Sequence, residues 1–345
     1  MRKKTKEVRI GSILIGGKNP IAVQSMVKVH PALLNDAIDQ IKKLVSVGCD
    51  LVRIAVPDME GAEAISEIKK KVAIPLVADI HFDYRLALEA IKRGADKIRL
   101  NPSNIRSGEN IKKVVSLAKE RGIPIRVGAN VGSLKGNLSK KDKVEELFNV
   151  MKNEVSILES LDFHNIVLSA KCSEIDLNYG INKKLSENYI YPIHIGITEA
   201  GTIVAGIVKS SLGIFRLLNE GIGDTIRVSL TGELENEVIS GISILKALSL
   251  RKGVDIVSCP TCGRAKIDVK KFTFLIEKKL SGTKKDIKIA IMGCEVNGPG
   301  EARDADIGIA GSADKAVLFE RGEIVAKGEP SYIMELLFKK ISEIM

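Results

Sequence analysis

Three cysteines near the C-terminal end have the type and spacing of metal ligands. Cys259 and Cys262 form a Cys-x-x-Cys turn, and Cys294 begins a second turn, rich in Gly and Pro, that runs to Glu301. A Cys-x-x-Cys turn directs two thiolates to one point, and a third thiolate from a distant loop closes a site for a soft metal. Because Pro299 lacks an amide proton and its glycine neighbours allow positive φ, we expect this turn to fold back and bring Glu301 towards the same point.

Three thiolates and one oxygen ligand favour a [4Fe–4S] cluster with one iron open to substrate. A closed zinc site needs a fourth Cys or a His, and the sequence has no second Cys-x-x-Cys and no His after His194. Structural zinc stays an alternative, as does a redox-active cysteine pair, although the turn lacks the strand-to-helix setting of such pairs. The remaining cysteines, Cys49 and Cys172, are predicted to be packing residues.

Charge and composition favour a small anionic ligand. The net charge is +10, Trp is absent and no basic block stands out, which points to a phosphorylated substrate rather than nucleic acid. No apolar run has the length of a membrane span, and the basic start is followed by Glu7 and Arg9 instead of an apolar stretch. We therefore expect a cytoplasmic protein with no membrane partner. The odd number of cysteines, five, suits a reducing compartment.

Two patterns divide the chain. In residues 1–250, eight short apolar runs alternate with amphipathic segments, several of which end at Gly48, Gly94 or Gly122, as helix C-termini do. This rhythm predicts an α/β fold, a (β/α)8 TIM barrel, with a hairpin at residues 8–17 on its floor. An open doubly wound sheet is the rival fold, but the sequence has no Gly-rich phosphate-binding fingerprint of the kind such sheets carry. The apolar runs are 21–26, 51–56, 75–80, 97–101, 123–131, 165–171, 191–198 and 225–230, and the amphipathic segments include 37–47, 62–71, 84–93, 111–121, 143–160 and 238–248.

Residues 251–345 have a different rhythm and predict a smaller α+β domain that carries the metal. Strands are expected at 255–258, 287–292 and 307–310, and helices at 270–280 and 330–344. A hairpin is expected at 317–327, around Arg321 and Gly322.

Side chains at the carboxyl ends of barrel strands face the active site. Five cations on five strands fall there, and charges inside a barrel rim are costly unless they are paired or bind anions, so they predict a phosphate site. For any one of them alone, a salt bridge is the simpler interpretation. Glu199 is either a proton donor or acceptor for substrate or a counter-ion, and Asp79 and His81 bind hydroxyls or orient neighbours. The strand-end residues are Gln24, Ser25, Arg53, Asp79, His81, Arg99, Asn101, Arg126, Asn130, Ser169, Lys171, Thr198, Glu199, Arg227 and Ser229.

Taken together, these motifs resemble the 4-hydroxy-3-methylbut-2-en-1-yl diphosphate synthase family, iron–sulfur enzymes of non-mevalonate isoprenoid biosynthesis. The likeness covers almost the whole chain. It rests on Val23-Gln-Ser-Met26, Val52-Arg-Ile-Ala-Val-Pro57, Ala78-Asp-Ile-His-Phe82, Ile98-Arg-Leu-Asn-Pro102, Arg126-Val-Gly-Ala-Asn130, Ile195-Gly-Ile-Thr-Glu-Ala-Gly201, Gly223-Asp-Thr-Ile-Arg-Val-Ser-Leu-Thr231, Ser258-Cys-Pro-Thr-Cys-Gly-Arg264 and Asn297-Gly-Pro-Gly-Glu301.

The resemblance implies reductive dehydration and ring opening of 2-C-methyl-D-erythritol 2,4-cyclodiphosphate. It implies a [4Fe–4S] cluster held by Cys259, Cys262, Cys294 and Glu301, with Glu301 leaving iron for substrate, and Glu199 as the acid. It also implies flavodoxin or ferredoxin as electron donor and a head-to-tail homodimer in which one chain's cluster domain caps the partner's barrel. The implied substrate-binding residues are Arg53, Asp79, His81, Arg99, Asn101, Arg126, Asn130, Lys171, Thr198, Arg227 and Ser229.

One segment departs from the family. After Met26 the family continues with a Thr- and Asn-rich loop, whereas residues 27–31 here are Val-Lys-Val-His-Pro. Lys28 and His30 are therefore assigned no family role. A related barrel reductase acting on another phosphorylated substrate, and a non-catalytic zinc-stabilised anion-binding protein, are the alternative functions.

Overall fold

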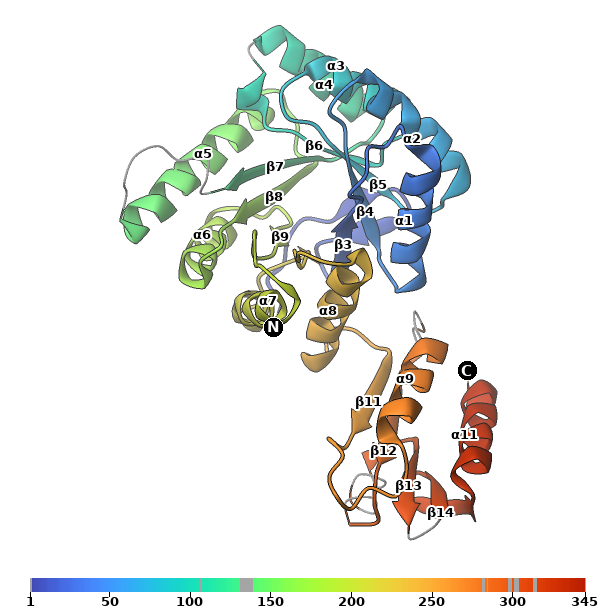
Figure 1. Cartoon of the computed structure of the whole chain (residues 1–345). Helices are drawn as coiled ribbons and strands as arrows, with labels where there is room; N and C mark the ends of the chain where they lie inside the picture. The colour runs from blue at the N-terminus through green and yellow to red at the C-terminus, as the bar shows by residue number, and fades with distance from the viewer. Residues whose placement is uncertain are drawn as a thin grey trace. The chain divides into compact units, whose positions relative to one another are not determined.

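The computed structural model describes residues 2–105, 107–130, 139–280, 283, 285–296, 300, 304–312 and 315–344. The chain forms two compact units, Met1–Arg251 and Lys252–Met345, each with its own apolar core (Figure 1). In the part of the chain that the structure describes, no helix combines the length and apolar character needed to cross a membrane.

The first unit is a barrel of eight parallel strands, as predicted. The sheet order is β8-β7-β6-β5-β4-β3-β10-β9. A bridge between Leu168 and Ile193, with the Leu168 N–H 2.8 Å from the Pro192 oxygen, joins its two ends. The strands are β3 (Ala22–Met26), β4 (Leu51–Ala55), β5 (Leu76–Asp79), β6 (Lys97–Arg99), β7 (Ile125–Asn130), β8 (Ile166–Lys171), β9 (His194–Ile195) and β10 (Thr225–Ile226).

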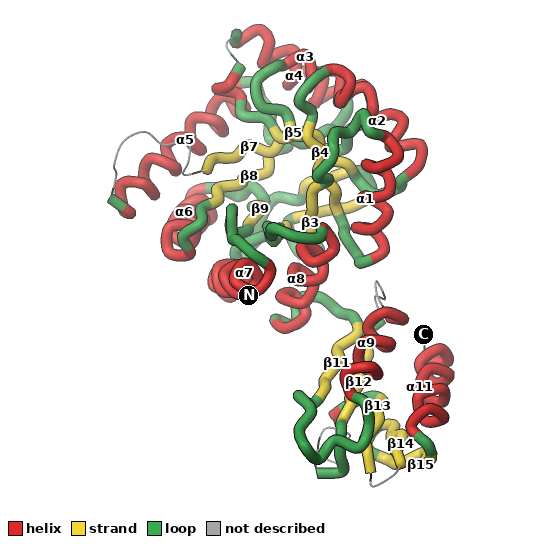
Figure 2. Tube along the Cα trace, viewed as in Figure 1, coloured by secondary structure: helices red, strands yellow, loops and turns green. Residues whose placement is uncertain are grey.

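Helices surround these strands, and each buries one apolar face against them (Figure 2). In α1, for example, Ala37, Ile41 and Leu44 recur at helical spacing and are buried. The predicted helix ends at Gly48, Gly94 and Gly122 are confirmed, because all three have positive φ. The helices are α1 (Leu34–Ser46), α2 (Met59–Lys71), α3 (Tyr84–Lys92), α4 (Gly108–Glu120), α5 (Lys140–Ser160), α6 (Ile175–Asn188), α7 (Ile203–Asn219) and α8 (Leu234–Ala247), with a 3-10 turn at η1 (Pro102–Asn104).

A hairpin closes the amino-terminal end of the barrel. Strands β1 (Val8–Ile10) and β2 (Ile13–Ile15) pair antiparallel. Val8, Ile10 and Ile15 pack against Ala22, Leu51 and Val167, which lie near the starts of three barrel strands. The predicted floor is confirmed, and the strand-end residues therefore lie at the opposite end of the barrel.

Strands β9 and β10 are shorter than predicted, with two residues each. Beyond Ile195, a Cβ on Gly196 would lie only 2.2 Å from the Arg227 carbonyl oxygen. The Gly196 backbone therefore passes close to Arg227 directly after the last paired residues of the two parallel strands.

In the described part of the second unit, a five-stranded sheet packs against two helices. Strands β11 (Val254–Ser258), β12 (Ile287–Met292) and β13 (Ile307–Ser312) are parallel; β14 (Lys315–Glu320) and β15 (Glu323–Gly328) are antiparallel. Helices α9 (Val269–Leu280) and α11 (Pro330–Ile344) pack on it. The predicted hairpin is confirmed: Arg321 and Gly322 have φ of 48° and 87°, as two-residue turns of this kind require.

Candidate active site

The predicted cations share the interior of the barrel. Strand side chains alternate between faces, and the outward positions Ile54, Ile98 and Val127 belong to the core under the helices. The register sets Asp79 beside Arg99 and Arg99 beside Arg126, and Asn130 beside Lys171. We call the five predicted strand-end cations the cationic cup: Arg53, Arg99, Arg126, Lys171 and Arg227.

Asp79 lies between two of these arginines. Its carboxylate oxygens are 3.8 Å from Nε of Arg53 and 3.7 Å from Nε of Arg99. Nη1 of Arg99 donates to Nδ1 of His81 at 2.8 Å, which leaves the His81 proton on Nε2, 3.5 Å from Asp79. Burial alone would raise the pKa of Asp79, but His81, Arg53 and Arg99 together hold it far below its usual value. Asp79 is therefore an ionised counter-ion of the cup.

Arg126 is the most deeply buried member of the cup, with 2% of its surface exposed. Among the residues that the structure describes, its Nε and Nη1 have no hydrogen-bond partner. Burial lowers the pKa of Arg126 well below its usual value, and the nearby charge of Arg53 lowers it further. A buried guanidinium with unused donors is the strongest mark of an anion site in the barrel.

Lys171 is joined to a histidine that the sequence argument missed. Its Nζ donates to Nε2 of His194 at 3.0 Å, and Nδ1 of His194 is 2.7 Å from the Thr225 hydroxyl oxygen. Burial and the Lys171 charge keep the pKa of His194 well below its usual value, so the imidazole is neutral. The available signal was its position, since His194 precedes Gly196 and Thr198 at alternate positions on the inward face.

Arg227 is held by a second missed residue, Glu237 of α8. Nη2 of Arg227 is 3.3 Å from Oε2 of Glu237, which also accepts from the Ser25 hydroxyl at 2.9 Å. The other carboxylate oxygen accepts from the Leu230 N–H at 3.2 Å. The expectation that Ser25 faces the barrel interior is wrong: it points outward to α8, whereas its neighbour Gln24 is buried inside.

The other predicted polar residues differ in their hydrogen bonds and in their burial. The Asn101 amide exchanges two hydrogen bonds with the Gly128 backbone, so it ties β6 to β7. Thr198 and Ser229 are half-buried near the strand ends, Asn130 ends β7 and Ser169 is buried. Glu199 is exposed and has φ of 51°, a conformation that non-glycine residues rarely adopt. Such backbone strain occurs often at functional sites.

The unusual loop after Met26 forms a wall beside the cup. Nδ1 of His30 accepts from the Ala32 N–H at 3.2 Å, so its Nε2 carries the proton and donates to Asp58 at 3.1 Å. Lys28 donates to the Gly232 carbonyl oxygen. The loop borders a cavity of about 420 Å³ that also reaches Pro57 and Arg227.

In the second unit, the cysteines lie at the carboxyl ends of two paired strands. β11 and β12 are parallel, and Ser258 is opposite Ile291. Sγ of Cys259 accepts from the Gly293 N–H at 3.1 Å, which brings the first cysteine turn to the residue before Cys294. Cys262 is exposed, and a hydrogen bond from the Arg264 backbone lowers the pKa of its thiol.

These thiols fit a soft metal by their chemistry, because thiolates prefer iron–sulfur clusters and zinc. Within the described ranges, no three His, Cys, Asp or Glu side chains are grouped closely enough to hold one ion. The predicted ligand Glu301 lies outside the described residues. Cys49 and Cys172 are buried in the barrel as predicted, and burial raises the pKa of each to about 12.

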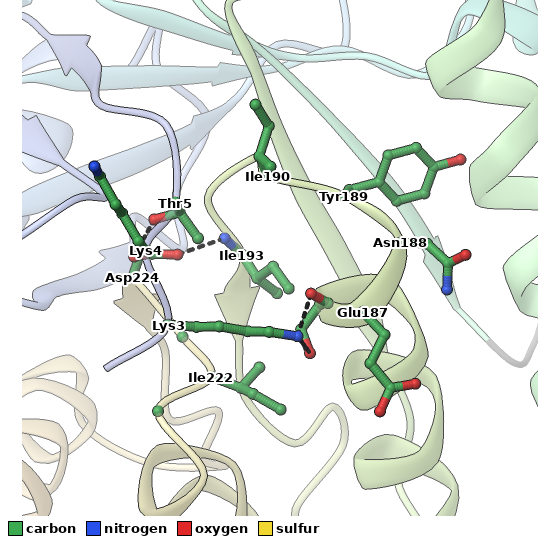
Figure 3. Close-up of a pocket in the computed structure, with 13 residues that line it drawn as sticks. Lys3, Lys4, Thr5, Glu187, Asn188, Tyr189, Ile190, Ile193, Ile222 and Asp224 are labelled. Atoms are coloured by element: carbon green, nitrogen blue, oxygen red, sulfur yellow. Dashed lines mark hydrogen bonds between the residues drawn. The ribbon is translucent and has the colours of Figure 1, made fainter. Parts of the chain in front are cut away.

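A second cavity, of about 280 Å³, lies at the floor of the barrel (Figure 3). Asp224 links two segments that line the cavity: its carboxylate accepts from the Thr5 hydroxyl and from the Ile193 N–H, each at 2.9 Å. The N-terminal segment, including Lys3 and Lys4, forms one side. None of the predicted site residues lines this cavity.

The fold and the site define a (β/α)8-barrel protein with a basic mouth and a separate unit that presents three thiols. Comparison with known families is more specific. Residues 5–242 match the GcpE TIM-barrel domain and residues 255–343 match the GcpE protein C-terminal domain, so the chain belongs to the GcpE family. This confirms the predicted family resemblance and the predicted fold class.

Curated relatives match along their whole length. A protein of Caldanaerobacter subterraneus is 51% identical over 349 residues, covering 100% of this chain and 98% of the relative. One of Thermotoga maritima is 48% identical over 340 residues, covering 99% and 98%. Both are named 4-hydroxy-3-methylbut-2-en-1-yl diphosphate synthase (flavodoxin).

Among solved structures, the barrel is similar to dihydropteroate synthase of Xanthomonas albilineans. The TM-score is 0.54 at 14% identity, over 71% of this chain and 97% of that one. At this identity the likeness concerns the fold alone.

Proposed function

We propose that this chain catalyses the reaction named by its relatives, the formation of 4-hydroxy-3-methylbut-2-en-1-yl diphosphate with flavodoxin as electron donor. The substrate is 2-C-methyl-D-erythritol 2,4-cyclodiphosphate, whose ring is opened by reductive dehydration. The observation that carries the proposal is the cationic cup with its buried, unpartnered Arg126. Such a site is stable when a multiply charged anion fills it.

In this proposal the cup binds the diphosphate. Arg126 and Lys171 act from the depth of the barrel, and Arg53, Arg99 and Arg227 act nearer the mouth. The carbon skeleton then lies towards the cavity that the 27–31 loop borders, where Val27, Val29 and Pro57 supply apolar surface. Asn101 positions β6 through Gly128. The proposed auxiliary contacts come from Asp79, His81, Asn130, Thr198 and Ser229.

Glu199 is the proposed acid at the departing hydroxyl group. It is exposed at the strand-end side of the barrel, and its strained backbone supports a functional position. Protonation of a leaving hydroxyl needs a carboxyl group within hydrogen-bond reach of it.

We assign residues 1–250 to substrate binding and residues 251–345 to a [4Fe–4S] cluster. Cys259, Cys262, Cys294 and Glu301 would hold the cluster, which supplies the two electrons that the reductive dehydration needs. The hydrogen bond between Cys259 and Gly293, and the lowering of the Cys262 thiol pKa by the Arg264 backbone, support this donor set. Cluster thiolates need a reducing environment, which supports a cytoplasmic location.

We further propose a homodimer, with each chain's C-terminal unit capping the partner's barrel. Helix α7 supports self-association, since Val204, Val208, Leu212 and Phe215 form an exposed apolar stripe on it. Leu212→Lys is expected to shift the protein to monomers in sedimentation experiments. Val45→Lys, at another exposed apolar position, is the matched control, and a Leu212→Lys protein that stays dimeric contradicts this interface.

Colour and turnover test the main proposal. Protein purified without oxygen should be brown and hold on the order of four iron atoms per chain. With dithionite it should convert the cyclodiphosphate; colourless zinc protein would support the non-catalytic alternative, and a brown protein without turnover would support a different phosphorylated substrate. Cys294→Ser should lose the iron, whereas the buried Cys172→Ser should keep it. A full iron content in Cys294→Ser contradicts the ligand set.

A further inference from the structure

A fully buried lysine lies beneath the cationic cup. Lys97 is on β6, two residues before Arg99, and therefore on the same inward face. Its position along the strand is about 7 Å deeper in the barrel. Its side chain is 0% exposed, and its Nζ has no hydrogen-bond partner among the residues that the structure describes.

A second inward-facing polar side chain of the barrel is also buried without a partner. Gln24, on β3, is 1% exposed, and neither its Oε1 nor its Nε2 has a partner within the described ranges. β3 and β6 are three strands apart in the sheet, so the two side chains enter the interior from different sides. Folded proteins leave few buried polar groups unsatisfied. Lys97, Gln24 and Arg126 therefore offer unused donors and acceptors to a polar ligand inside the barrel.

The charges around Lys97 oppose a permanent ammonium group there. Burial lowers the pKa of Lys97 well below its usual value, and the charges of Arg126 and Arg53 lower it further. The carboxylates nearby already serve other cations, Asp79 with Arg53 and Arg99, and Glu237 with Arg227. The titratable and charged groups that share the interior are Arg53, Asp79, Arg99, Arg126, Lys171, His194 and Arg227.

We propose that Lys97 is a further ligand of the diphosphate and that it takes up a proton from solvent when the anion enters the barrel. This inference rests on the proposed function. In the empty barrel, burial and the charges of Arg126 and Arg53 disfavour the ammonium form of Lys97. An anion in the cup reverses the local potential, so the amine binds a proton and donates to a phosphoryl oxygen. Binding and proton uptake are then linked.

Calorimetry on the oxidised holoenzyme tests this, with the cyclodiphosphate as ligand and no reductant, so that no turnover occurs. Each phosphorus of this ligand has a single ionisable oxygen, so the ligand itself does not titrate near neutral pH. Binding heats at pH 8 in two buffers of different ionisation enthalpy, Tris and PIPES, give the number of protons taken up. We expect Lys97→Met to take up fewer protons, by up to about one, and to bind on the order of 10- to 100-fold more weakly.

Lys119→Met, an exposed lysine on α4, is the matched control and should behave like the wild type. Equal proton uptake by the wild type and Lys97→Met overturns the inference. A second measurement needs no variant: wild-type affinity should fall as pH rises from 6 to 9, and a constant affinity also overturns it. If the wild type does not bind the cyclodiphosphate at all, the proposed function fails instead.

Discussion

Arg227, directly after β10, lies against the buried carboxylate of Glu237, with Nη2 of the arginine 3.3 Å from Oε2 of the glutamate. Glu237 belongs to α8, on the outer layer of the barrel, and is 2% exposed. It also accepts from Ser25 and Leu230, so three groups depend on one carboxylate. An outer helix thus fixes the position of a cation in the cup.

Glu237→Ala is expected to lower the free energy of unfolding by about 3 kcal/mol, because it leaves a buried cation and two donors without their acceptor. The loss of position at Arg227 should also raise KM for the cyclodiphosphate more than it lowers kcat. Denaturant unfolding and steady-state kinetics measure the two effects. Glu235→Ala, on the same helix, is the control and should change stability by no more than about 0.5 kcal/mol. If the two variants have the same free energy of unfolding and the same KM, Glu237 stabilises neither the fold nor the position of Arg227.

The cup could be predicted from sequence because it depends on local rules. Side chains alternate along each strand, and a closed barrel brings the strand ends together, so the placement of Arg53, Asp79, Arg99 and Arg126 follows from spacing. The inward placement of His194 and Lys97 follows from the same alternation, but their roles, and that of Glu237, do not. Their roles depend on contacts and burial that only the folded barrel determines: a helix face turned to Arg227, a ring against Lys171, and a lysine enclosed below the rim.

The sequence predicted correctly that the two cysteine-bearing turns lie next to each other. The pairing of β11 with β12 brings the turn of Cys259 to that of Cys294, as the motif spacing indicated. Ser25 shows that a position at the carboxyl end of a strand does not by itself place a side chain in the site. A shift of one residue along the strand turns the side chain from the barrel interior to the surrounding helices. The lengths of β9 and β10 were also wrong: pairing ends after Ile195 and Ile226, where Gly196 lies close to Arg227, a residue far away in sequence.

Asp79 should make stability depend on pH in the acid range. Its pKa in the folded protein lies below that of an ordinary carboxyl group, so its contribution is complete above about pH 5 and is lost as pH falls below about 4. Asp79→Asn lacks this contribution. The difference in free energy of unfolding between wild type and Asp79→Asn should be about 3 kcal/mol at pH 7 and should narrow progressively as pH falls below about 4, towards the low pKa of Asp79 in the folded protein.

Denaturant titrations at several pH values measure this difference, and cluster loss in acid cancels because it affects both proteins. Asp39→Asn, at an exposed site on α1, is the control, expected to stay within about 0.5 kcal/mol of the wild type throughout. A difference for Asp79→Asn that does not change with pH would mean that the carboxylate is not held ionised by the arginines.

Gly196 should tolerate no side chain. An added Cβ would lie 2.2 Å from the Arg227 carbonyl oxygen and 3.1 Å from Nζ of Lys171, and a backbone oxygen shifts less readily than the end of a flexible side chain. Gly196→Ala is therefore expected to cost more than about 2 kcal/mol of stability and to weaken cyclodiphosphate binding, because both cations shift. Gly108→Ala, at the first residue of α4 with open space around it, is the control and should be neutral in thermal unfolding. A stable, fully active Gly196→Ala protein would mean that Gly196 and Arg227 do not approach as closely as described.

Glu199→Gln separates catalysis from binding at the site. The amide keeps the size of the side chain but cannot deliver a proton, so kcat should fall by about 100-fold or more while KM, iron content and unfolding temperature stay close to those of the wild type. Glu187→Gln, at the floor cavity, makes the same change at the opposite end of the barrel and should leave kcat intact. Turnover with dithionite avoids any effect on flavodoxin docking. If Glu199→Gln turns over at the wild-type rate, the proton comes from another group, and the strained backbone at Glu199 then requires a structural explanation.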